Sequence, residues 1–111
     1  MIKNILTVGD SFTYGEELEN LHDAWPQQLA NRIKNSHLVN LGEPAASNDK
    51  IVRKTIEHIL GNTVDLVVIG WSSPGRIELA DEMGVYDVWP GYGGNLFTRD
   101  DCDWRMTVCE Y

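Results

Sequence analysis

The stretch that decides the fold lies near the start of the chain and reads Ile5-Leu6-Thr7-Val8-Gly9-Asp10-Ser11-Phe12-Thr13-Tyr14-Gly15. Apolar and β-branched residues predominate over residues 2–8, which predicts a buried strand, and Gly9 ends it with a residue that can take backbone angles closed to others. Ser11 is therefore expected at the carboxyl end of a strand, where open α/β sheets place their ligands. A hydroxyl there can act as a nucleophile if a base removes its proton and if backbone N–H groups are placed to stabilise the negatively charged oxygen that forms on the substrate. The same residues are also compatible with a plain strand and an Asp-Ser turn, whose side chains only bond turn amides.

Length and composition limit the classes of protein to which the chain can belong. The 111 residues fit one domain, and 42% hydrophobic with 23% charged residues is ordinary for a globular chain. A formal net charge of −8 argues against a nucleic-acid or anionic-membrane partner, because both need a basic surface. No apolar run approaches the roughly 20 residues of a membrane helix and no signal-peptide pattern opens the chain, so we expect a cytoplasmic protein.

The cysteines and acidic residues near the end of the sequence give no sign of a metal or cofactor. Cys102 and Cys109 match no metal-ligand spacing, and free thiols or a disulfide both remain open. Asp100, Asp101 and Asp103 lack the Gly and Glu spacing of a calcium loop, so a solvated loop is the interpretation. We expect neither a metal nor a cofactor.

The segment after the Ser11 loop predicts a first helix over residues 24–35. Asp23 is a candidate N-cap, and a proline in the first turn is tolerated there. Trp25, Leu29 and Ile33 recur four apart and form one apolar stripe, which is expected to pack on the sheet.

Two further strands and a second helix follow. Residues 37–41 predict a short strand, and Ser47 or Asn48 can cap a helix that ends at residues 61–62. Residues 65–70 are apolar almost throughout and predict a third strand covered on both faces. The order β-α-β-α-β indicates an α/β fold with a parallel sheet.

Beyond Trp71 the composition of the sequence changes. Gly, Pro and Asp punctuate residues 84–103 among scattered aromatics, which predicts an ordered loop, and a short element is expected over residues 101–108. No clear fourth strand follows the third one, so that strand is expected to need a cover at its edge. The segment near Thr107 and Val108, a second copy of the chain, or a C-terminal portion beyond it are the three candidates.

The string Gly-Asp-Ser-Phe-Thr-Tyr-Gly at residues 9–15 resembles block I of the SGNH hydrolases, the GDSL esterase and lipase family. The resemblance implies a flavodoxin-like three-layer sandwich in a single, incomplete domain over residues 1–111, with the C-terminal part missing or reduced. It makes Ser11 the nucleophile, gives its N–H to the oxyanion hole, and leaves Asp10 to support the loop. The start of the chain is also similar to SGNH-like proteins of bacteriophages and bacteria, which implies a phage-encoded or virion-associated protein.

Two later loops resemble blocks II and III of the family. In the first, the oxyanion residue falls on Ala45, whose backbone N–H could serve as the usual glycine does; a Gly-Pro turn is the alternative. In the second, Ser72 stands where the family has an oxyanion Asn, and a plain Ser-Ser-Pro turn is the alternative. Trp71, Ser73 and Arg76 are candidate substrate-binding residues.

Arg76 and Glu78 are expected near the start of a helix. They can form either a pair at the edge of the site that recognises an anionic group, or a surface ion pair of small energetic effect.

The family's Asp-x-x-His motif, which carries the general base, is absent from this chain. Glu19, Lys34 and Thr55 stand three residues before the histidines, which are His22, His37 and His58. Only His22 follows the Ser11 loop closely enough to be considered as a base.

The resemblance implies hydrolysis of a small-molecule or carbohydrate ester, such as an acetyl group on a sugar, through an acyl-serine intermediate. A non-catalytic binding or virion structural module that lacks the base is the alternative. A truncated chain that folds with a partner is the third interpretation.

Overall fold

The structure is a computed structural model and describes residues 1–88. Its elements are, in chain order, β1 (Asn4–Gly9), α1 (Ser11–Tyr14), the 3-10 helix η1 (Leu21–Asp23), α2 (Trp25–Asn31), β2 (His37–Asn40), α3 (Asn48–Gly61), β3 (Leu66–Gly70), β4 (Ile77–Asp81) and β5 (Gly84–Val88). The expected loop from residue 89 on, the element expected over 101–108, and both cysteines lie outside this range.

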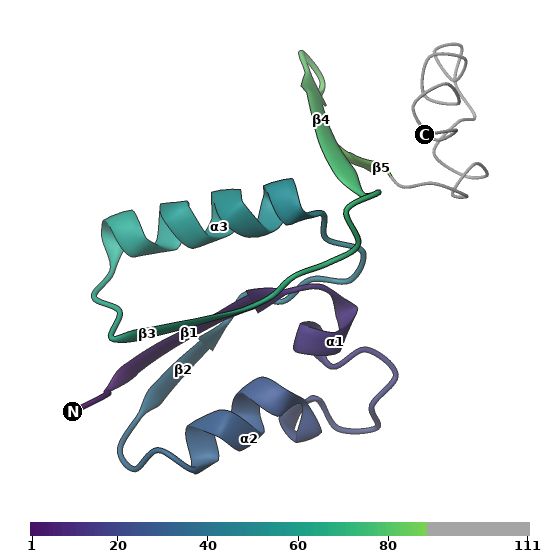
Figure 1. Cartoon of the computed structure of the whole chain (residues 1–111). Coiled ribbons are helices and arrows are strands. Elements are labelled where there is room, and N and C mark those ends of the chain that lie inside the picture. Colours follow the sequence, from purple (N-terminus) through teal and green to yellow (C-terminus); the bar gives the residue numbers. More distant parts are fainter. Residues whose placement is uncertain (89–111) are drawn as a thin grey trace.

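A parallel three-stranded sheet forms the centre of the domain. The strand order is β2-β1-β3, with Leu6 of β1 opposite Val39 on one side and Val67 on the other. Figure 1 shows α3 over one face of this sheet and α1 with α2 over the other. The α/β class and the parallel sheet predicted from the sequence are therefore confirmed.

The core lies mainly between the sheet and α3. Leu6 and Val8 of β1, Ala46, and Ile51 of α3 are at most 1% exposed and form one cluster. Half-buried apolar residues pack around it, namely Val39, Leu41, Val64, Val67 and Ile69. Because successive residues of a strand point to opposite faces, the alternate residues of β1, Ile5 and Thr7, are buried on the face toward α2.

Gly9 is the last residue of β1, where no space is left for a side chain. The expectation that Gly9 uses backbone angles closed to other residues is wrong. The positive-φ glycines in residues 1–88 are Gly15 and Gly84, so Gly9 does not use the left-handed region. A Cβ on Gly9 would lie 2.7 Å from Thr13 Cβ and 2.9 Å from Gly70 O. The missing side chain lets α1 fold back tightly over the end of β1 and β3.

The first long helix is shorter than predicted. α2 ends at Asn31 rather than residue 35: Arg32 N and Ile33 N bond to carbonyls three residues back instead of four, and Ser36 Oγ donates to Ala30 O. Asp23 is not its N-cap: Asp23 belongs to η1, and Ala24 precedes α2 without a side-chain cap. Pro26 and Ala30 are the buried residues of α2, whereas the predicted stripe of Trp25, Leu29 and Ile33 is half-buried.

The second helix agrees with the prediction. α3 begins after Ser47, whose Oγ accepts a hydrogen bond from Lys50 N, and it ends at Gly61 with Asn62 as C-cap.

The chain after β3 forms an antiparallel hairpin that was not predicted. β4 pairs with β5, Ile77 standing opposite Val88, and Figure 1 shows the hairpin beyond the carboxyl end of the parallel sheet. The expectation of a helix starting near Arg76 and Glu78 is wrong, as is that of a loop at residues 84–88. Glu78 stands between the apolar Ile77 and Leu79, which is a short strand pattern.

Candidate functional site

Three loops meet at the carboxyl edge of the parallel sheet, because parallel strands all end at the same edge. The loop after β1 holds Ser11, the loop after β2 holds Ala45, and the loop after β3 holds Ser72. Glu43 N donates to Gly9 O at 3.0 Å, which ties the second loop to the first. The structure thus brings the three sequence-predicted segments to one edge.

Ser11 is the first residue of α1 and is half-buried. Its main-chain carbonyl accepts hydrogen bonds from Gly15 N and Glu16 N at 2.9 and 3.0 Å, which fixes the turn. Its hydroxyl makes no hydrogen bond within residues 1–88. The hydroxyl is therefore not used up in holding the turn, in contrast to the plain-turn interpretation of this residue.

Asp10 holds the Ser11 turn and also reaches the loop after β3. Its Oδ1 accepts from Phe12 N at 3.1 Å as the N-cap of α1, and its Oδ2 lies 3.5 Å from Arg76 Nη1. Both carboxylate oxygens thus have a partner. Asp10 acts on Ser11 through the backbone of the turn.

Ala45 occupies the left-handed region with φ 63°. This conformation is uncommon for a residue with a Cβ and is the one that glycine adopts without strain. Ala45 N donates no backbone hydrogen bond in the part of the chain that the structure describes. An N–H held this way is free to meet an acceptor from a ligand.

Ser72 is clamped by α3. Asn48 Oδ1 accepts from Ser72 N at 2.7 Å and Asn48 Nδ2 donates to Ser72 O at 3.1 Å, so one side chain holds both main-chain groups. Ser72 Oγ accepts from Arg76 Nη1 at 2.9 Å. Because that contact uses a lone pair, the hydroxyl proton of Ser72 stays available for donation.

The other predicted binding residues lie on the same loop. Trp71 is 59% exposed and Ser73 is exposed, with Ser73 Oγ accepting from Gly75 N at 3.3 Å. Arg76 is half-buried and joins Asp10 to Ser72, as described above. The predicted Arg76 and Glu78 pair does not form: Glu78 lies on β4 and accepts two hydrogen bonds from Arg53, both at 2.9 Å.

A second ionic cluster lies beside the site and was missed from the sequence. Lys50 Nζ is 2.7 Å from Glu43 Oε2 and 2.6 Å from Asp87 Oδ2, and the Lys50 side chain is 12% exposed. Burial alone would lower the pKa of Lys50, but the two carboxylates outweigh it and raise that pKa. The cluster fastens the loop after β2 and the hairpin to the first turn of α3.

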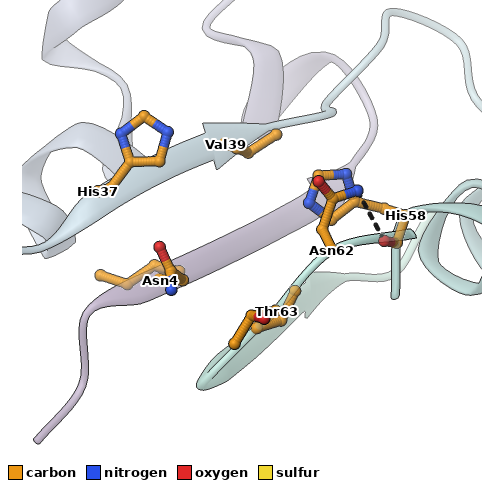
Figure 2. A pocket seen from close by; sticks show the side chains of 8 residues that line it. Asn4, His37, Val39, His58, Asn62 and Thr63 are labelled. Atoms are coloured by element: carbon orange, nitrogen blue, oxygen red, sulfur yellow. Dashed lines mark hydrogen bonds between the residues drawn. The ribbon is translucent and has the colours of Figure 1, made fainter. Parts of the chain in front are cut away.

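Two of the three histidines, His37 and His58, lie away from the three loops. His37 and His58 border a hollow at the amino end of the sheet with Asn4 and Asn62, as Figure 2 shows. Since His37 stands opposite Asn4 and Ser11 follows the far end of β1, about 20 Å of strand separates them. These two histidines are therefore not partners of Ser11 within the chain.

His22 lies in η1 and borders another hollow with Tyr14, Gln27, Leu38 and Asn40, on the α2 side of the sheet. No hydrogen bond joins its ring to Ser11 in residues 1–88.

Among the described residues, no group of three His, Cys, Asp or Glu side chains is arranged to hold a metal ion. The three aspartates considered above for calcium lie outside this range. No helix in residues 1–88 is long and apolar enough to cross a membrane.

Comparison with known proteins places the chain in a family. No curated protein and no solved structure matches it. Residues 11–100, which include Ser11, Ala45, Ser72 and Arg76, match a family model, and the chain belongs to the family of unknown function DUF6071.

Proposed function

We propose that this chain hydrolyses carboxylic esters with Ser11 as the nucleophile, on a flavodoxin-like fold of the SGNH type. The observation that carries the proposal is the Ser11 hydroxyl, half-buried and without an intramolecular hydrogen bond in residues 1–88, at the sheet edge shared with Ala45 and Ser72. Such an edge is where open parallel sheets bind ligands. An acetyl ester of a carbohydrate is the substrate class that the family resemblance suggests.

The proposed chemistry needs donors for the negative charge that develops on the ester oxygen. Ser11 N, at the start of α1, and Ala45 N donate no backbone hydrogen bond in the described part, and Ser72 Oγ keeps its proton. Preorganised donors of this kind stabilise the tetrahedral intermediate, and removing one typically costs about 10²–10³-fold in rate. Arg76 fixes the position of the Ser72 hydroxyl and ties it to Asp10, so it acts as a positioning residue.

A second candidate is a binding module of the same fold without catalysis. The observation that favours it is the placement of the histidines, two at the opposite edge of the sheet and the third without a hydrogen bond to Ser11. In that case the exposed Trp71 ring and Ser73 would contact a sugar, and Ser11 would only donate a hydrogen bond to it.

Labelling with a fluorophosphonate separates the two candidates. For an esterase we expect one adduct on Ser11, located by mass spectrometry, lost in Ser11→Ala and kept in Ser36→Ala, a half-buried serine outside the three loops. An unlabelled wild-type chain that binds an acetylated oligosaccharide, with binding weakened in Trp71→Ala, would instead support the binding module and refute the esterase.

A further inference from the structure

β3, one of the two outer strands of the parallel sheet, has an open edge in the described residues. Asp65 N donates to Asn4 O at 2.9 Å, and backbone groups alternate in direction along a strand. Val67 and Ile69 therefore direct their N–H and C=O groups toward β1. Leu66, Val68 and Gly70 direct theirs away from it, and β3 has no strand partner on that side within residues 1–88.

An apolar stripe on α3 lies above this edge. Val52, Ile56 and Ile59 are 43%, 52% and 45% exposed. The opposite flank of the helix faces β2, because Lys54 Nζ reaches Leu41 O there. Since Ile51 and Thr55 face the sheet, the stripe is left on the flank over β3.

The open strand and the exposed stripe together form one surface, here called the β3 edge. Its lower part offers a row of backbone groups that have no partner within residues 1–88, and its upper part offers three aliphatic side chains on one helix flank. An extended segment with apolar residues on one face fits both parts, because it can bond to the strand and cover the stripe at once.

The chain itself contains such a segment. Residues 89–111 follow β5, and within them Trp104, Met106 and Val108 alternate with Arg105, Thr107 and Cys109. Strict alternation of this kind is the pattern of a strand with one apolar face. The intervening residues 89–103 can span up to about 50 Å when extended, several times the length of β3.

We propose that residues 104–109 of the same chain bind along the β3 edge and add one strand to the three of the parallel sheet. In this arrangement Trp104, Met106 and Val108 cover the stripe on α3. A tethered segment meets the edge at a high effective concentration. A second copy would have to approach against a net charge of −8 on each chain.

Hydrogen exchange on the full chain at low concentration tests this, with light scattering to confirm a monomer. The amides of Leu66 and Val68 should exchange about 100-fold or more slowly than free peptide, as those of Val67 and Ile69 should because they bond to β1. In Thr107→Pro, protection at Leu66 and Val68 should be lost while Val67 and Ile69 keep theirs. Thr98→Pro, a proline in the intervening residues, should leave all four amides protected.

Three results of this experiment would overturn the proposal. They are fast exchange at Leu66 and Val68 in the wild type, protection that survives Thr107→Pro, and protection that appears only as the concentration rises. The last result would indicate a second copy at the β3 edge.

A spin label gives a readout that does not depend on the proline variant folding. Placed on Cys109 in a Cys102→Ser chain, it should broaden the signals of Val68 and Ile56 within one molecule. Mixing labelled chain with isotope-labelled, spin-free chain should produce no broadening. Broadening seen only in the mixture, or none in either sample, would refute the intramolecular strand.

Discussion

Replacing Asn48 by Ala should weaken the loop that carries Ser72. In the wild type, one amide side chain accepts from Ser72 N at 2.7 Å and donates to Ser72 O at 3.1 Å. The alanine removes both contacts and leaves two main-chain groups of a half-buried residue to water. No other residue in the described range bonds to those two atoms.

The expected cost follows from the two hydrogen bonds and the helix. Each bond contributes about 0.5–1.5 kcal/mol net, so their loss costs about 1–3 kcal/mol. Asn48 is the first residue of α3, and alanine is the better helix former by up to about 0.7 kcal/mol, which offsets part of the loss. We expect a net decrease of about 0.3–2.3 kcal/mol in the free energy of unfolding.

Urea denaturation followed by circular dichroism measures this change, and hydrogen exchange localises it. The midpoint should fall by about 0.2–1.5 M, and the amide of Ser72 should exchange faster than in the wild type. Asn62→Ala is the matched control at the other end of α3, because Asn62 Nδ2 makes a single exposed bond, to His58 O in the last turn of that helix. A midpoint for Asn48→Ala no lower than that of the control, with an unchanged Ser72 amide, would show that the clamp does not hold the loop.

Three further predictions concern the core and the ionic clusters. Ile51→Ala, at a residue 0% exposed, should cost about 2–5 kcal/mol, whereas Leu60→Ala, at a residue 83% exposed, should cost less than about 0.5 kcal/mol; equal urea midpoints would contradict the packing. Lys50→Met should lower the free energy of unfolding by about 2–3 kcal/mol in the same assay. This is less than the loss expected on breaking a fully buried ion pair, because the two carboxylate partners are 41% and 27% exposed; an unchanged midpoint would count against the ion cluster. Hydrogen bonds from Lys50 and from Arg53 lower the pKa values of Glu43 and Glu78, respectively. The ionised carboxylates therefore stabilise the folded state fully above about pH 4.5, and this stabilisation is lost as the pH falls through the lowered pKa values. Between pH 6 and pH 3 the wild-type midpoint should therefore drop further than that of a Glu43→Gln, Glu78→Gln chain, and parallel curves would refute the assignment.

Local pattern was enough to predict most of the parallel sheet and α3. The apolar run before Gly9 and the run at residues 65–70 became β1, which is buried after its first residue, and β3, which is half-buried throughout rather than fully covered. Ser47 was among the two N-caps proposed for α3, since a hydroxyl before a helical pattern is a specific signal. The end of α2 was missed because Ile33 keeps the four-residue spacing although the chain has already left the helix.

The hairpin was harder to predict because its strands are short and partly exposed. Ile77 and Leu79 flank Glu78 in strand-like alternation, and Gly84 takes φ 140° after the turn. These signals were present, but aromatic and glycine residues nearby favoured a loop. Strand preference depends strongly on what the exposed face contacts, and here the contact is the Arg53 side chain on α3.

The contacts that organise the candidate site could not be predicted from local pattern at all. Asn48 and Ser72 are 24 positions apart, and Arg76 is 66 positions from Asp10. Nothing in the spacing of the sequence selects these partners, because they are set by which strands stand side by side in the sheet. Sequence reasoning placed the loops together but assigned Arg76 to the wrong carboxylate.

The position of Ser11 depends on both neighbouring strands. Asp10 caps the turn that carries Ser11, and the same carboxylate meets Arg76, whose other contact is the Ser72 hydroxyl. A shift of β3 along β1 would therefore pull on Asp10 and Ser72 together. β3 also has an open edge within residues 1–88, so whatever binds that edge restrains one side of the candidate site. For this reason, occupancy of the β3 edge should favour a fixed arrangement of Ser11 and Ser72, whichever of the two proposed functions the site performs.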